Sequence, residues 1–188
     1  MPAERRPPVS ERRHERGKSP RIDVSLATSP DSVQTLQTAL QTKAKNESAA
    51  RFHSLWDKVC REDILAEAYR RCRRNRGAPG IDGESFEDIE TAGREAWLGR
   101  LQQELKGKSY QPGPLLRVWI AKASGGERPL GIPSIRDRVV QTAVLLVIGP
   151  VFEPDLFPWQ YGFRTGLDAK MAVRRIHFGI SDRGKREV

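Results

Sequence analysis

The segment LRVWIAKASGGERPLGI, residues 116–132, decides the fold of this chain. Within residues 115–121, Leu116, Val118 and Ile120 alternate with Arg117 and Trp119, which is the two-residue period of a β-strand. The run Ser124-Gly125-Gly126 is a hairpin turn signal, because glycine adopts the backbone conformations that tight turns require. We therefore predict a β-hairpin whose returning strand runs from Arg128 to Ile132.

Helical patterns lie on both sides of this hairpin, where apolar residues recur every three or four positions. Ser134 is a suitable N-cap for the helix that follows the hairpin, because its hydroxyl can accept from the free amides of the first turn. We expect Gly149-Pro150 to break that helix. The predicted helical stretches are 52–59, 64–72, 85–107, 136–151 and a last one that begins at Thr165 or Asp168. The predicted fold class is α+β, mainly helical with one β-hairpin.

Residues 1–47 are predicted to form a basic, solvated leader. From Met1 to Arg21 there are seven basic residues, three acidic residues and four prolines. Such a segment buries too little apolar surface to offset the entropy of ordering it. From Ser25 to Asn46 the chain is rich in Ser, Thr and Gln, with one short helix expected from Asp31 onward.

The composition favours a nucleic-acid partner. Lysine and arginine number 33 against 24 aspartates and glutamates, a formal charge of +9, and such a chain usually meets a polyanion. A soluble protein with a general basic bias is the alternative. The longest apolar run, 143–148, is too short to cross a bilayer, and no secretory signal is visible, so we expect no membrane partner. Two cysteines, Cys60 and Cys72, and three dispersed histidines favour neither a zinc site nor a disulfide framework. We expect a nucleic-acid-associated protein of a reducing, bacterial-type cytoplasm.

Two groups of cations are candidate phosphate ligands. Lys122 and Arg128 flank the predicted hairpin turn, where they suit a di- or triphosphate. Cations beside a turn are also an ordinary feature of exposed strands. The second group lies at the end of the 64–72 helix, where it suits either the negative pole of the helix dipole or the phosphates of a nucleic acid. That group is Arg70, Arg71, Arg73, Arg74 and Arg76.

Several motifs, in order, make the chain recognisable. They are NRGAPGIDG at 75–83, YQP at 110–112, Lys122, RPLGIP at 128–133, DRVVQ at 137–141 and QYGFRTG at 160–166. Together they resemble the first sequence blocks of group II intron-encoded reverse transcriptases, over residues 48–188. The chain departs from the family pattern at Ala121, where a proline is usual, and at Leu167, where a basic residue is usual.

The resemblance implies the fingers of a right-hand polymerase and the start of its palm, truncated near residue 188. It implies that Lys122, Arg128 and Arg164 bind the incoming dNTP. It places Gly131, Ile132 and Pro133 against the template and the nascent base pair. It also places the arginines of the second group, Arg70, Arg71, Arg73, Arg74 and Arg76, where template RNA or intron RNA is gripped.

Polymerisation requires Mg²⁺ ions held by aspartates, and the resemblance places these aspartates beyond Val188. We interpret Asp155, Asp168 and Asp182 as turn or cap residues, so we predict no catalytic and no metal-ligating residue within the chain. Mg²⁺ is expected for the complete enzyme only. The sequence therefore predicts the N-terminal part of an RNA-directed DNA polymerase that is inactive alone. An RNA-binding, maturase-like module without polymerase activity is the alternative, and a basic helical protein without either function is a third. No oligomeric state is predicted.

Overall fold

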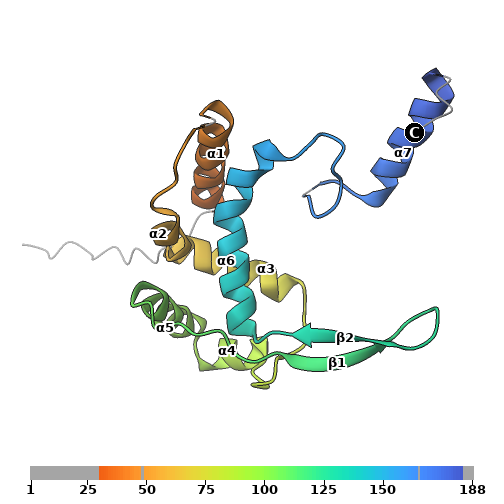
Figure 1. Ribbon diagram of the computed structural model, residues 1–188. Helices are drawn as coiled ribbons and strands as arrows, with labels where there is room; N and C mark the ends of the chain where they lie inside the picture. Colours follow the sequence, from red (N-terminus) through yellow and green to blue (C-terminus); the bar gives the residue numbers. More distant parts are fainter. Residues whose placement is uncertain (1–29, 48, 165, 184–188) are drawn as a thin grey trace, which may run out of the picture.

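The computed structural model describes residues 30–47, 49–164 and 166–183. Within this part a group of helices carries a two-stranded antiparallel hairpin that extends away from it (Figure 1). The elements are α1 (Pro30–Asn46), α2 (Leu55–Val59), α3 (Glu62–Arg74), α4 (Phe86–Ala92), α5 (Arg94–Lys106), β1 (Leu116–Ala121), β2 (Glu127–Ile132), α6 (Ile135–Phe152), the 3-10 turn η1 (Glu153–Asp155) and α7 (Ala169–Arg183). The mainly helical α+β class predicted from the sequence is confirmed.

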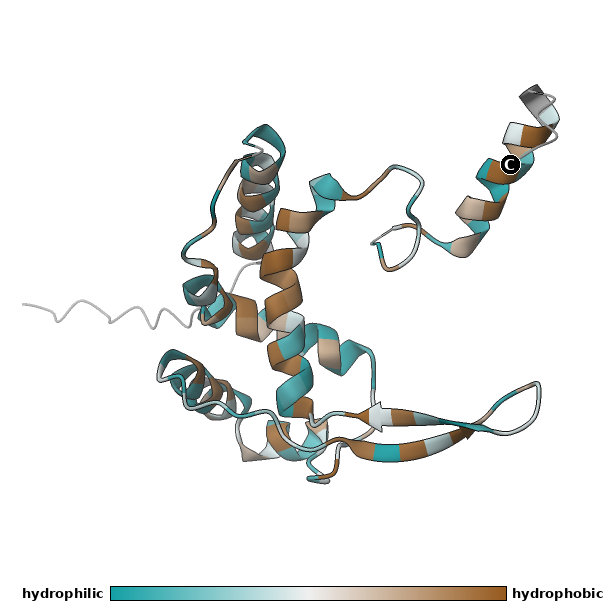
Figure 2. Cartoon of the chain, viewed as in Figure 1, coloured by the Kyte–Doolittle hydropathy of each residue, from teal (hydrophilic) through white to brown (hydrophobic). Residues whose placement is uncertain are grey.

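Helix α6 is the centre of the core. It is apolar over most of its circumference, as Figure 2 shows by its colour, and such a helix is stable in water only when other elements surround it. Helices α1, α2 and α3 pack against it, and Val139, Ala143 and Val147 are completely buried. Ser134 caps its first turn, as predicted, by accepting a hydrogen bond from the Asp137 amide at 3.1 Å.

The short helix expected from Asp31 onward is present as α1, but it packs against the core where the sequence predicted a solvated segment. Val33 and Leu40 are only 3% and 5% exposed, and Leu36 packs beside them against the same core. These three residues follow an i, i+3, i+7 spacing, which puts them on one face of a helix. The polar composition around them hid this sparse pattern. Residues 1–29, the rest of the predicted leader, lie outside the described residues.

Pro150 does not break α6, which continues to Phe152. Proline has no N–H, so the carbonyl of Leu146, four residues earlier, has no partner within the helix. The side chain of Gln37 on α1 donates to that carbonyl from Nε2 at 2.9 Å. A distant helix therefore supplies the hydrogen bond that proline removes, and the predicted break is wrong for this reason.

Two other helix boundaries differ from the prediction. The stretch 85–107 is two helices, divided at Gly93 with φ = +100°. Ser85 and Asp88 form a capping box at the start of α4. Helix α3 extends to Arg74, beyond the predicted 64–72, and Arg76 after it has a left-handed backbone with φ = +48°.

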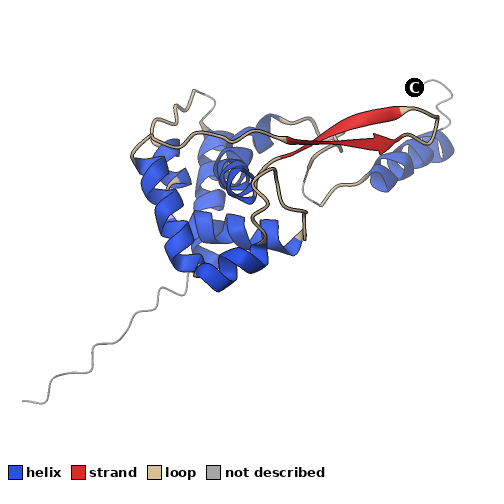
Figure 3. Cartoon of the chain, turned by 90° about the horizontal axis from the view of Figure 1, so that it is seen from below, coloured by secondary structure: helices blue, strands red, loops and turns tan. Residues whose placement is uncertain are grey.

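Helix α7 stands apart from the helices around α6 in both Figure 1 and Figure 3. Its apolar side chains remain largely exposed within the described chain. Among the described helices none is both long and apolar enough to cross a membrane.

Candidate nucleic-acid interface

The register of the hairpin places Lys122 and Arg128 on one face. Arg128 lies opposite Ile120 in the ladder, and the Lys122 amide donates to the Gly126 carbonyl at 3.0 Å, which extends the pairing by one step. Side chains two positions apart along a strand share a face, so Lys122 follows Ile120 on the face that carries Arg128. Both cations are exposed. The structure therefore brings together the two hairpin cations that the sequence selected.

The turn between them is open backbone. Gly125 and Gly126 have φ of +86° and +78°, a conformation that side-chain-bearing residues rarely adopt. The Gly125 amide donates to the Lys122 carbonyl at 3.1 Å and closes the loop. Residues 123–126 carry no side chain larger than the hydroxymethyl group of serine, so they do not obstruct a phosphate group that approaches either cation.

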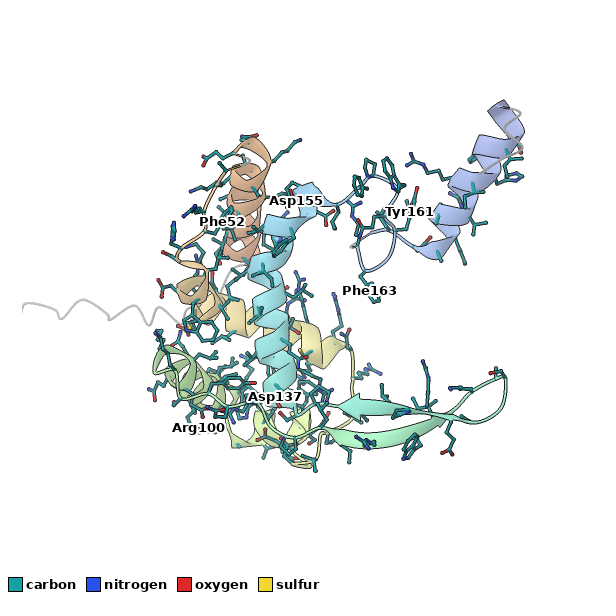
Figure 4. All side chains as sticks on the ribbon, in the orientation of Figure 1. Phe52, Arg100, Asp137, Asp155, Tyr161 and Phe163 are labelled. Carbon is teal, nitrogen blue, oxygen red and sulfur yellow. The ribbon has the colours of Figure 1, made fainter. Side chains whose placement is uncertain are left out.

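A buried carboxylate anchors the base of the hairpin. Asp137 is 3% exposed. It accepts hydrogen bonds from the Tyr110 hydroxyl at 2.6 Å and from the Gly113 amide at 3.0 Å. Burial, together with the hydrogen bond to Asp137, raises the pKa of Tyr110. Because Tyr110 and Gly113 precede β1 and Asp137 follows β2, this one carboxylate fixes both ends of the hairpin relative to α6 (Figure 4).

The NRGAPGIDG motif packs at Gly80 against the end of the RPLGIP motif and the Ser134 that follows it. A Cβ at that position would lie 2.6 Å from the Cα of Ser134 and 2.7 Å from its backbone nitrogen, so only glycine allows the approach. Arg138 fastens the same loop by donating from Nη2 to the Ala78 carbonyl at 2.6 Å. Pro133, the last residue of the Gly131-Ile132-Pro133 segment, thus lies beside Gly80, at the junction of the hairpin and α6.

The basic end of α3 is partly neutralised. Arg70 and Arg71 both pair with Glu67 at 2.7 Å, and the hydrogen bonds from Arg70 are the main reason that the pKa of Glu67 is lowered. Arg73 pairs with Glu90 at 2.9 Å. Within the described chain no ion pair engages the two remaining arginines of the group, which are exposed; these are Arg74 and Arg76. Five cations against two carboxylates leave three net positive charges at this helix end.

Arg164 does not join the hairpin cations in this structure. It pairs with Glu153 through Nε at 2.9 Å and Nη2 at 2.5 Å, and Nη1 donates to the Phe157 and Gln160 carbonyls. Its side chain is 16% exposed. The hairpin leads into the first turn of α6, whereas Glu153 follows the last turn of this helix. An 18-residue helix is about 27 Å long, so the hairpin and Glu153 lie at opposite ends of that length. Arg164 therefore organises its own loop at the far end of α6.

The sequence of the chain is similar to parts of several known proteins. The chain is 36% identical to protein YkfC of Escherichia coli K12 over 155 residues, which are 81% of the chain and 40% of YkfC. It is 32% identical to the group II intron-encoded protein LtrA of Lactococcus lactis subsp. cremoris over 128 residues, 66% of the chain and 21% of LtrA. The chain belongs to the family of group II intron-encoded proteins.

A yeast relative extends the match along more of the chain. The putative COX1/OXI3 intron 1 protein of Saccharomyces cerevisiae is 25% identical over 170 residues, 88% of the chain and 20% of that protein. No family model matches. The chain thus spans less than half of the length of these group II intron-encoded proteins and their relatives.

The carboxylates of the chain form no metal-binding cluster in residues 30–47, 49–164 and 166–183. Asp168 caps α7, as predicted, by accepting a hydrogen bond from the Met171 amide at 2.7 Å. Asp155 ends η1 beside the loop that follows α6 (Figure 4), and Asp182 falls within α7 and not in a turn.

Sequence reasoning missed the acidic partners of the basic helix end. Glu67 could have been found, because it precedes Arg70 and Arg71 by three and four residues, the spacing of neighbours on a helix surface. No local signal pointed to Glu90, which belongs to a different helix and reaches Arg73 only through the packing of α4. The anchoring role of Asp137 was likewise invisible, although its motif was recognised.

Proposed function

We propose that this chain is part of a group II intron-type RNA-directed DNA polymerase, in which the hairpin binds the triphosphate of the incoming dNTP. The observation that carries the proposal is the shared face of Lys122 and Arg128 on an anchored hairpin. Arginine can grip two phosphate oxygens at once, whereas lysine acts as a mobile point charge, so the pair suits adjacent phosphate groups. In this proposal residues 48–188 correspond to the fingers and the start of the palm.

The template RNA would lie across the junction of the hairpin and α6. Supporting features are the close packing of loop 77–80 against Pro133-Ser134 and the net positive end of α3. Arg74 and Arg76 are the strongest candidates there, because Arg70, Arg71 and Arg73 already have carboxylate partners. Phosphate contacts of this kind carry no sequence information, so they fit a template of any sequence or a structured intron RNA.

Polymerisation in this family would use Mg²⁺, which is proposed for the complete enzyme. The described residues do not fit such a site, because none of their His, Cys, Asp and Glu side chains gather in groups of three or more. Arg164 is proposed as a residue that shapes the 157–164 loop, and its proposed contact with nucleotide would first require release from Glu153.

The test compares two matched double variants of the full chain. Lys122→Ala/Arg128→Ala removes the hairpin cations, and Arg100→Ala/Lys106→Ala removes two exposed cations of α5. Binding of a fluorescent dNTP is measured by anisotropy, with dNMP as competitor. We expect the hairpin variant to bind at least about tenfold more weakly, since each lost charge-assisted contact is worth roughly 1.5–3 kcal/mol, and to lose its preference for triphosphate over monophosphate. Equal affinity in the two variants would refute the triphosphate role.

The second candidate is an RNA-binding, maturase-like module without polymerase activity, which the net positive end of α3 favours independently of the hairpin. Both candidates predict that structured RNA binds with a steep salt dependence. They differ in the hairpin: only the polymerase requires Lys122 and Arg128 for nucleotide. Arg74→Ala/Arg76→Ala is expected to reduce the slope of log affinity against log salt by about 2, roughly 0.9 for each lost phosphate contact. An unchanged slope would exclude this helix end from the RNA interface.

A further inference from the structure

Two aromatic rings lie stacked and uncovered on the loop between α6 and α7. The Phe157 and Trp159 ring centroids are 5.1 Å apart and the ring planes differ by only 6°. The side chains are nevertheless 61% and 63% exposed, so most of their surface faces solvent. Large rings that pack with one another but not with a core leave apolar surface in water, a feature that marks interaction sites.

The loop holds this ring pair in place. The Phe157 carbonyl accepts two hydrogen bonds, from Arg164 Nη1 and from the Gln160 amide, each at 3.0 Å. Arg164 is in turn fixed by its ion pair with Glu153 at the end of α6. The backbone that carries the rings is therefore ordered before any ligand arrives, which removes part of the entropic cost of binding.

Phe163 adds a third uncovered ring on the same loop. Its φ is +59°, a left-handed conformation that is uncommon for a bulky side chain. Its side chain is fully exposed, and Figure 4 shows it projecting from the loop with Tyr161 on the adjoining backbone. Backbone strain at a non-glycine residue is found mainly where a side chain is held for a function.

The segment around the rings carries more cations than carboxylates. From residue 153 to 181 the carboxylates are Glu153, which pairs with Arg164, Asp155, which ends η1, and Asp168, whose Oδ1 caps α7. The lysine and arginine residues in the same interval are Arg164, Lys170, Arg174 and Arg175, and the last three are exposed on α7. Exposed aromatic faces and exposed cations are the two groups that bind single-stranded nucleic acid, since bases stack on the rings and phosphates pair with the cations.

We propose that Phe157 and Trp159 form a stacking platform for unpaired bases of single-stranded RNA, with Phe163 as an accessory ring. The proposal rests on the proposed function for its RNA partner, but it assigns a contact at the opposite end of α6 from the hairpin. The platform recognises any base, because every base presents a π-face. It therefore adds affinity for unpaired strands without adding sequence preference.

The experiment uses the full 188-residue chain and two 12-nucleotide probes, an unstructured RNA of mixed sequence and an abasic oligomer with the same number of phosphates. Phe157→Ala/Trp159→Ala is expected to weaken binding of the RNA by roughly five- to 150-fold for each base that loses its stacking partner, and to leave the abasic oligomer unaffected. Phe157→Tyr/Trp159→Phe keeps both rings and is expected to bind like the wild type. Leu145→Ala, an exposed apolar residue of α6, is the matched control. Because the removed side chains are largely exposed, the fold is expected to survive, which circular dichroism checks.

Each other outcome overturns the platform. Equal losses for both probes would mean that the rings act through fold or charge and not through bases. Unchanged RNA affinity together with a shift in sedimentation would make the ring pair a protein interface. If the hairpin variant Lys122→Ala/Arg128→Ala loses nucleotide while the aromatic variant binds RNA normally, the platform fails and the proposed function stands. If the wild-type chain binds neither probe, the RNA partner fails along with the platform.

Discussion

Replacing Gln37 with alanine tests whether α1 repairs the hydrogen bond that Pro150 removes from α6. In the structure Gln37 Nε2 donates to the Leu146 carbonyl at 2.9 Å, and Leu146 is 2% exposed. Leaving a buried carbonyl without a partner costs about 1–3 kcal/mol. Gln37 itself is half-buried, so water can reach part of this site. Alanine also has a higher helix propensity than glutamine, by roughly a few tenths of a kcal/mol. We expect Gln37→Ala to lower the free energy of unfolding by about 1–2 kcal/mol.

A double-mutant cycle isolates the mechanism. Pro150→Ala restores an N–H that can donate to the Leu146 carbonyl from within α6. In that background Gln37→Ala is expected to cost less than about 0.5 kcal/mol, which gives a coupling energy of about 1 kcal/mol between residues on different helices. Urea unfolding followed by circular dichroism at 222 nm measures all four variants, with the exposed α1 residue Gln34→Ala as control. If Gln37→Ala costs the same with proline or alanine at 150, the proposed repair is wrong.

Two further predictions concern the base of the hairpin. Gly80→Ala is expected to destabilise the chain by about 1–3 kcal/mol because its Cβ would meet the backbone of Ser134. Gly99→Ala, at a position in α5 that faces open space, is expected to stabilise it. Shifts of the urea unfolding midpoint in the same direction for both variants would contradict the packing argument. The raised pKa of Tyr110, caused by burial and by its hydrogen bond to Asp137, means that the fold prefers the neutral phenol. This contribution is fully present below the ordinary pKa of 10.0 and is lost as pH rises above it. Tyr110→Phe is therefore expected to make the unfolding free energy fall less steeply above pH 10, and an identical slope in the variant and the wild type would argue against it.

The local pattern predicted the hairpin well because its information lies in adjacent residues. Alternation, the Ser124-Gly125-Gly126 turn and the Ser134 cap each depend on contacts within a few positions, and the structure confirms all three. The pairing of Lys122 and Arg128 followed from the same local register. The family could also be recognised from short motifs, because their order along the chain is itself a property of the sequence.

Contacts between distant segments decided the rest. The packing of α1, the continuation of α6 through Pro150 and the neutralisation of Arg73 each depend on a partner in another helix: α6, Gln37 and Glu90 respectively. Arg164 is a further case in which the sequence was not sufficient. Its motif predicted a ligand contact, whereas in the folded loop its guanidinium pairs with Glu153. The sequence by itself determined the element types, the positive charge and the family. Only the tertiary structure decided which cations remain free to bind a ligand, because a side chain is occupied or available according to which groups the fold brings within hydrogen-bonding distance of it.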